Sequence, residues 1–314
     1  MQVDQDFIDA LKKNLSSSRL DPYSTYFNCK NEAEALGVYQ WNKAVSTAFY
    51  PLLQSVEVTL RNSMHNAAKS HFSGNSEWFL MKRFPNSNKF VNNKVYKERG
   101  NWITPRPTAN DAISKLTFGF WVTLLTNTYN DSVNNTLLWP TLIPDAFPNA
   151  SGSKATRQFI HDRFELIKNF RNRVSHHEPL WKINDELDGG CVLLRAGPTT
   201  PEESIIRLQE YIDLILEALE WLSIERYQYL VNSGITEHLK AICSLNALEK
   251  FQGVTTNSFT FNKFKNEIIE NKINNNSISG FYSLKTSPKG IFKGDTLILD
   301  IKHLKPAKYE TTLT

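Results

Sequence analysis

The sequence has 314 residues, of which 40% are hydrophobic, 12% aromatic and 22% charged. This composition excludes a disordered chain and predicts a packed globular protein with one large domain, or a main domain and an appendage. The net charge of +4 permits binding to an anion such as RNA but does not require it.

Cysteine usage and hydropathy exclude several other classes of protein. Cys29, Cys191 and Cys243 lie far apart and form no Cys-x-x-Cys pair, which indicates a reducing cytosol rather than a zinc site or a disulfide framework. We therefore expect neither a metal nor another cofactor. The sequence contains no apolar run of membrane-spanning length and begins without a signal-peptide pattern, so we expect a cytoplasmic protein with no membrane contact.

The first part of the chain predicts a short helix over residues 4–15 and a long helical pattern from 31 to about 70. In the long pattern, apolar residues recur every three or four positions and share one face. They are Val45, Phe49, Leu53, Val56, Leu60, Met64 and Ala67. Pro51 interrupts the run, so it either kinks one long helix or begins a second one.

Residues 73–110 are polar and predict mainly a loop. The stretch 81–110 is basic and also contains Trp102 and Tyr96, a combination that suits contact with an RNA backbone and stacking on bases. A solvated loop explains the same composition. The candidate RNA-binding residues in this segment are Lys82, Arg83, Lys94, Lys97, Arg99 and Arg106.

The second part predicts helices over 110–129, 154–175 and from Thr200 past Trp221 towards Tyr229, the last with a capping box of Thr200 and Glu203. One more helix is expected over 236–250. Short β-like runs follow at 258–261, 280–283 and 296–301. We therefore expect a helical domain over 1–235 and a small, basic, mixed α/β accessory region over 236–314.

The most informative segment contains Arg171, Asn172 and His176. Cleavage of RNA through its 2′-hydroxyl requires a side chain that moves protons near neutral pH and a fixed cation that holds the phosphate charge. Histidine meets the first need and arginine the second, and no metal is required. The alternative is structural, because histidine is also favourable at a helix C-terminus and arginine often pairs with a buried acid.

Helix geometry constrains how these residues act together. Arg171 falls on the same side as Ile160 and Phe164, so its guanidinium must be paired or line a site. Asn172 and His176 are four positions apart and are neighbours on a helix. Arg171 and His176 are separated by about 140° on a regular helix. Either the helix ends before His176, or a homodimer combines two copies of the motif in one cleft.

A looser echo of the motif occurs in the long helical pattern. Glu57, Arg61 and His65 are four positions apart, with Asn62 beside them. They form either a charge ladder that supports the helix or a polar wall of an RNA site, with Arg61 and His65 as RNA-binding residues.

Several blocks, in order across about residues 18–225, make the sequence similar to a known family. The block from Arg171 to Trp181 matches an Arg-Asn-x-x-(Ala/Ser)-His-His-x-x-Leu-Trp pattern. The other blocks are Ala35–Asn42, Ala48–Leu52, Val56–Asn62, Lys115–Val122, Leu138–Pro140 and Ala146–Pro148. Together they resemble the Abi-like (abortive infection) proteins of the AbiD and AbiF type.

The resemblance implies a mainly α protein with a HEPN-type helical bundle. It further implies that Arg171 holds the phosphate, Asn172 orients the histidine, and His176 is the acid–base group, with His177 as a second site histidine. The first hypothesis is a metal-independent RNA endonuclease toxin of phage defence. The second is a non-cleaving RNA-binding protein that associates with a structured small RNA, and the third is a purely structural helical dimer.

Overall fold

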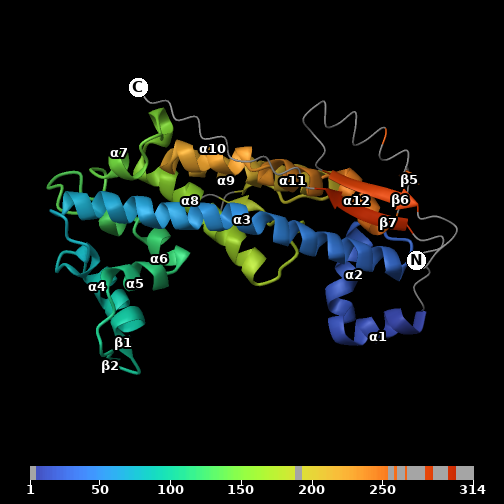
Figure 1. The fold of residues 1–314 in the computed structure, drawn as a ribbon, viewed down its shortest axis with the longest axis horizontal. Helices are drawn as coiled ribbons and strands as arrows, with labels where there is room; N and C mark the ends of the chain where they lie inside the picture. The colour runs from blue at the N-terminus through green and yellow to red at the C-terminus, as the bar shows by residue number, and fades with distance from the viewer. Residues whose placement is uncertain are drawn as a thin grey trace. The chain divides into compact units, whose positions relative to one another are not determined.

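The computed structural model describes residues 5–187, 193–253, 258–259, 266, 280–285 and 296–301. Most of these residues lie in helices, which confirms the expectation of a mainly α fold (Figure 1). Cys191 and most of the predicted accessory region lie outside the described residues.

The first three helices are α1 (Gln5–Leu15), α2 (Ser17–Tyr26) and α3 (Glu32–His71). Helix α3 is a single element of 40 residues that continues through Pro51. All seven apolar residues of its predicted face are buried. The sequence pattern therefore predicted both the helix and its packed side.

The prediction of a loop over 73–110 is wrong. This stretch forms the 3₁₀ turn η1 (Trp78–Leu80), helix α4 (Pro85–Val91), the π turn η2 (Asn92–Tyr96) and a hairpin of β1 (Lys97–Glu98) and β2 (Asn101–Trp102). Arg99 and Gly100 form the hairpin turn, both with positive φ. These elements are too short to produce a periodic pattern, and the burial of Trp78, Phe84 and Tyr96 stabilises them instead.

The middle of the chain forms α5 (Ala109–Lys115), α6 (Phe118–Thr123), η3 (Asn127–Tyr129), α7 (Ile143–Ala146), η4 (Gly152–Lys154) and α8 (Arg157–Ser175). The single helix predicted over 110–129 is divided because Thr117 begins a new helix, accepting a hydrogen bond from the Phe120 amide at 3.3 Å. Helix α8 agrees with its prediction to within three residues at its start, and Ile160, Phe164 and Ile167 on its apolar face are buried.

A short antiparallel pair, β3 (Glu186–Leu187) and β4 (Leu193–Arg195), precedes α9 (Pro201–Leu222). Thr200 caps α9 as predicted, accepting a hydrogen bond from the Glu203 amide at 3.2 Å. The predicted continuation of this helix past Trp221 is wrong. A new helix, α10 (Ile224–Asn232), begins after Ser223, whose hydroxyl accepts a hydrogen bond from the Arg226 amide at 3.2 Å.

Two helices, α11 (Ile235–Ile242) and α12 (Leu245–Gln252), replace the single helix expected over 236–250. The strands β5 (Ser258–Phe259), β6 (Gly280–Lys285) and β7 (Thr296–Ile301) form a sheet in that order. Strand β5 is parallel to β6, and β6 is antiparallel to β7. The β-like runs are thus confirmed, although positions 260 and 261 lie outside the described residues.

The chain divides into two compact units, each discontinuous in sequence. Unit 1 comprises Met1–Pro51, Arg173–Asp213 and Tyr229–Thr314, and unit 2 comprises Leu52–Asn172 and Leu214–Gln228. In unit 1, the Trp41 indole donates a hydrogen bond to the Ile242 carbonyl at 2.9 Å. In unit 2, the Trp139 indole donates to the Leu124 carbonyl at 2.6 Å. Buried tryptophans thus join sequence-distant segments within each unit.

Helices of membrane-spanning length and apolarity do not occur among the described residues.

Candidate functional site

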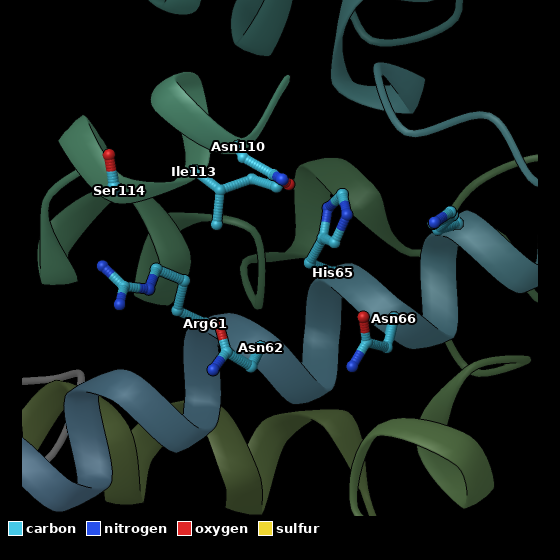
Figure 2. Close-up of a pocket in the computed structure, with 8 residues that line it drawn as sticks. Arg61, Asn62, His65, Asn66, Asn110, Ile113 and Ser114 are labelled. Atoms are coloured by element: carbon cyan, nitrogen blue, oxygen red, sulfur yellow. The ribbon is translucent and has the colours of Figure 1, made fainter. Parts of the chain in front are cut away.

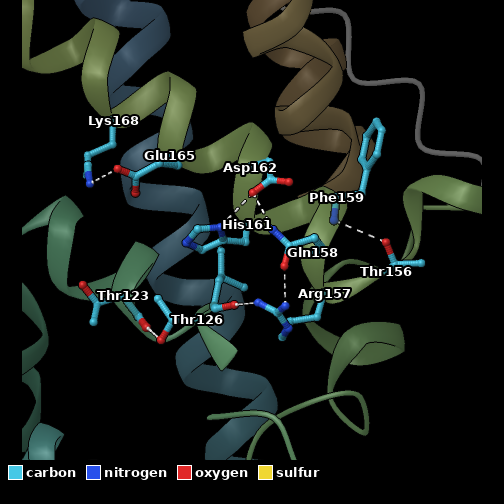
Figure 3. A network of polar contacts seen from close by, with 11 residues as sticks. Thr123, Thr126, Thr156, Arg157, Gln158, Phe159, His161, Asp162, Glu165 and Lys168 are labelled. Atoms are coloured by element: carbon cyan, nitrogen blue, oxygen red, sulfur yellow. Dashed lines mark hydrogen bonds and ion pairs between the residues drawn. The ribbon is translucent and has the colours of Figure 1, made fainter. Parts of the chain in front are cut away.

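The beginning of α8 is anchored by a network of polar side chains within unit 2 (Figure 3). Arg157 donates hydrogen bonds to the Leu125 carbonyl at 2.7 Å and to the Gln158 side chain at 2.5 Å. Gln158 in turn donates to Asp162 at 2.7 Å, and Asp162 also contacts the His161 ring at 3.0 Å. These bonds, together with the buried apolar face, fix the helix that carries Arg171.

Arg171 is held by an acid on a different helix. Its Nε lies 3.3 Å from Oε2 of Glu57 on α3, and its side chain is 37% exposed. Within the part of unit 2 that the structure describes, this ion pair is the only polar contact of the guanidinium. The pair offsets the desolvation energy of placing a cation on the apolar side of α8. It leaves the terminal nitrogens of Arg171 available to an anion.

Helix α8 ends at Ser175, directly before the two histidines. His177 adopts a left-handed conformation with φ of 57°, and its amide donates to the Val174 carbonyl at 3.2 Å. His176 and His177 are exposed, and Asn172 is half-buried. The expectation that the helix ends before His176 is therefore confirmed. Asn172 lies within α8 and His176 lies beyond its end, so the two are not neighbours on one regular helix.

The segment that carries the histidines is braced within unit 1 by three side chains. Arg173 donates from Nη2 to the carbonyl of Pro179 at 2.6 Å, and also to the carbonyl of Lys182. Arg19 donates to the His177 carbonyl at 2.8 Å. The buried Asn42 accepts a hydrogen bond from the amide of Leu180 at 2.8 Å. The backbone around His177 is thereby fixed although its side chain is exposed.

Arg61 and His65 line a cavity of about 310 Å³ between α3 and α5 in unit 2 (Figure 2). His65 is buried, and its Nδ1 accepts a hydrogen bond from the Trp78 indole at 3.3 Å. Because an indole only donates, Nδ1 must be unprotonated and Nε2 carries the proton of the neutral ring. Burial, with a smaller contribution from Lys69, lowers the pKa of His65.

A family model described as Abi-like protein matches residues 8–182, more than half of the chain. The chain belongs to the Abi-like family. The matched region contains Glu57 and Arg61 on α3, as well as the segment from Arg171 to Trp181. Comparison with curated proteins and with solved structures gives no match.

In this Abi-like protein, three cations of the basic segment lie over aromatic rings. The Arg83 guanidinium lies 5.3 Å from the centre of the Phe72 ring and donates to the Thr136 carbonyl at 3.1 Å. The Lys97 ammonium lies 4.6 Å from the centre of the Trp102 ring. Such contacts order the side chains but leave Arg83 exposed to solvent.

A third cation, Arg106, forms an ion pair with Glu77 at 2.8 Å and lies over the Tyr96 ring at 4.5 Å. Tyr96 donates to the same carboxylate at 2.8 Å, and burial and this hydrogen bond raise the pKa of its phenol. The remaining predicted cations of the segment are exposed: Lys82, Lys94 and Arg99. The structure thus brings Arg61 and His65 together, and gives the basic residues separate local partners or none among the described residues.

The sequence patterns missed several residues that surround these positions. Asn66 lies four positions after Asn62, and Lys69 lies four positions after His65, so the i, i+4 rule could have indicated them. Asn110 lies on α5 and reaches the cavity through tertiary packing, for which the sequence carries no local signal. The bracing role of Arg19 likewise depends on a contact between segments far apart in the chain, whereas Arg173 contacts carbonyls of the loop that directly follows α8.

Proposed function

We propose that this Abi-like protein is a HEPN-type, metal-independent RNA endonuclease that acts in abortive infection. The observation that carries the proposal is Arg171, held from α3 by Glu57 and followed along the chain by two exposed histidines at the end of α8. Arg171, Asn172, His176 and His177 are the proposed site residues. The protein would act in the cytoplasm, where phage and cellular RNA are both present.

The proposed chemistry uses protein side chains only. A histidine accepts the proton of the 2′-hydroxyl while the 2′-oxygen forms a bond to phosphorus and the bond from phosphorus to the 5′-oxygen breaks. A second histidine donates a proton to the departing 5′-oxygen. Arg171 stabilises the negative charge that develops on the phosphate oxygens. The products are a 2′,3′-cyclic phosphate and a 5′-hydroxyl.

We further propose that the site is formed in a homodimer. Two facing copies of the motif would supply two arginines and two pairs of histidines to one cleft. His176 is the acid–base group in this proposal, and Asn172 and His177 orient it or its partner. RNA is the substrate, and the exposed cations Lys82, Lys94 and Arg99 extend the contact with its backbone.

The experiment uses the full chain with labelled single-stranded RNA in the presence of EDTA. We expect cleavage by the wild type and none by Arg171→Ala or His176→Ala, with cyclic-phosphate ends on the products. His71→Ala, which removes an exposed histidine at the end of α3, is the matched control and should cleave normally. Binding of RNA without cleavage by every variant would reject the nuclease and favour a non-cleaving protein that carries a structured small RNA.

A further inference from the structure

The cavity between α3 and α5 has an unbalanced lining. Arg61, Asn62, His65, Asn66 and Lys69 come from consecutive turns of α3. The residues from α5 are Asn110, Ile113 and Ser114. Figure 2 shows Arg61 and His65 extending from α3 towards α5. The lining contains two cations and three amides but no carboxylate, so its electrostatic potential favours an anion.

Both cations lack partners within the described chain. The Nε atom of Arg61 is buried and makes no hydrogen bond, and neither Arg61 nor Lys69 forms an ion pair with any residue that the structure describes. A buried guanidinium nitrogen without an acceptor is costly, and a native protein normally satisfies such a group. Elsewhere in unit 2 the comparable Arg163 is paired with Glu217. The lining of this cavity therefore contains hydrogen-bond donors that an acceptor from outside the chain could satisfy.

His65 completes the set of donors without adding a charge. Trp78 occupies its Nδ1, so Nε2–H is the remaining polar group of the ring. The amides of Asn62, Asn66 and Asn110 add further donors, and the apolar side chain of Ile113 adds a surface on which a ring or sugar can pack. An arginine fork suits the tetrahedral oxygens of phosphate, and a lysine two turns further along the same helix adds positive charge to the lining. A cavity of about 310 Å³ is near the lower end of the range for small-molecule sites.

We propose that this cavity is a binding site for a phosphate ester, with Arg61 on the phosphate, Lys69 adding positive charge, and His65, Asn66 and Asn110 around the attached group. The volume suits a single nucleotide unit. The phosphate ester can belong to a free mononucleotide or to one nucleotide of an RNA chain, and both share the chemistry that the cavity recognises. The cavity lining shares no residue with the proposed cleavage motif, and this inference does not depend on cleavage.

Calorimetric titration of the full-length protein tests the proposal with four probes: inorganic phosphate, AMP, adenosine and a single-stranded oligoribonucleotide. A free mononucleotide as ligand predicts that AMP binds and adenosine does not. An RNA chain as ligand predicts that the oligoribonucleotide binds while AMP does not, with an affinity that falls as salt is raised. In either case Arg61→Gln should weaken binding about tenfold or more, because a charged hydrogen bond to phosphate is lost.

Lys115→Gln is the matched control, because Lys115 is an exposed cation on α5 that does not line the cavity. It should bind like the wild type, and Arg61→Lys should retain part of the affinity by keeping the charge. If Arg61→Gln is unfolded by circular dichroism, Lys69→Gln, at an exposed helical position, takes its place. Absence of binding for all four probes, or equal losses in the cavity and control variants, would overturn the proposal.

The cleavage-deficient His176→Ala variant separates this inference from the proposed nuclease. Its affinity for AMP or for the oligoribonucleotide at the cavity should equal that of the wild type. If the protein binds the phosphate ester but never cleaves RNA, the proposed binding site stands and only the proposed nuclease is rejected.

Discussion

At the scale of single residues, α8 places two arginines two positions apart with different tasks. Arg171 has a partly exposed ion pair with Glu57, whereas Arg173 is 18% exposed and donates to two backbone carbonyls. The sequence predicted that Arg171 must be paired or line a site, but it gave no reason to single out Arg173. Both arginines lie near the end of the same helix, and only the groups that they contact distinguish them.

Substitution of the two arginines should therefore have opposite consequences. Arg173→Gln should lower the free energy of unfolding by about 2 kcal/mol, because the carbonyls of Pro179 and Lys182 lose a charged donor whose side chain is only 18% exposed. Arg171→Gln should change it by less than about 1 kcal/mol, since exposed ion pairs contribute little, while abolishing the proposed cleavage. Urea unfolding and the RNA assay measure the two effects. Equal destabilisation by both substitutions would mean that Arg171 is also a structural residue.

Glu57, Arg61 and His65 on α3 also differ in the groups that they contact. The helical spacing correctly predicted that the three lie along one side of α3. It did not predict that Glu57 pairs with α8, whereas Arg61 and His65 line the cavity beside α5. Spacing along a helix defines a shared face, and the neighbouring helices decide what each side chain meets.

His65 should make stability depend on pH. Burial lowers its pKa in the folded protein below the value of the unfolded chain, about 6.5. The unfolded chain therefore binds a proton first, so this contribution to stability is fully present above pH 6.5 and decreases as the pH falls through the window just below it. Urea unfolding between pH 7.5 and 5.5 should show a smaller loss for His65→Gln, whose amide oxygen can still accept from Trp78. Parallel pH profiles for the two proteins would contradict this assignment.

At the scale of elements, long amphipathic helices were predictable and short ones were not. Helices α3, α8 and α9 carry enough repeats of the apolar pattern to define their face and extent. Helix α4 has seven residues, too few for a periodic signal, and its position depends on the burial of Val91 and Ser87. The division between α9 and α10 did have a signal, Ser223 as an N-cap, which the continuous hydrophobic pattern obscured.

Two glycines within helices provide a paired test of element packing. A Cβ atom on Gly37 would lie 1.9 Å from the Phe251 carbonyl oxygen, whereas one on Gly119 would meet only side-chain atoms at 3.8 Å and beyond. Alanine is favoured over glycine by about 1 kcal/mol inside a helix. Gly119→Ala should therefore stabilise the protein by up to about that amount.

Gly37→Ala should instead destabilise the protein, because α3 and α12 must separate in unit 1 to relieve a contact with backbone. Thermal unfolding followed by circular dichroism measures both variants. An increased melting temperature for Gly37→Ala would show that helix propensity outweighs the close approach.

At the scale of the whole molecule, the sequence predicted the family and the mainly α class but not the division into compact units. The unit boundaries fall inside helices, after Pro51 in α3 and after Asn172 in α8, where neither composition nor turn residues change abruptly. The proposed motif is itself divided, with Arg171 and Asn172 in unit 2 and both histidines in unit 1. Residue spacing alone therefore could not define the geometry of the proposed site.

A complementation experiment tests the proposed homodimer. Arg171→Ala and His176→Ala are each expected to be inactive alone. If the shared cleft contains two catalytic centres, each formed by the arginine of one chain and the histidines of the other, a mixed dimer retains one intact centre of two. Random mixing makes about half of the dimers mixed, so co-refolded variants should regain about a quarter of the wild-type rate, as the symmetry of a twofold dimer requires.

If arginine and histidine of the same chain act together, every site in the mixed dimer lacks one group and the activity stays absent. The same outcome follows for a monomer, so light scattering of the wild type must accompany the mixing. A dimer that fails to complement contradicts catalytic centres that combine the arginine of one chain with the histidine of the other. Recovery near a quarter instead assigns each centre to two chains, because neither variant alone carries both an intact Arg171 and an intact His176.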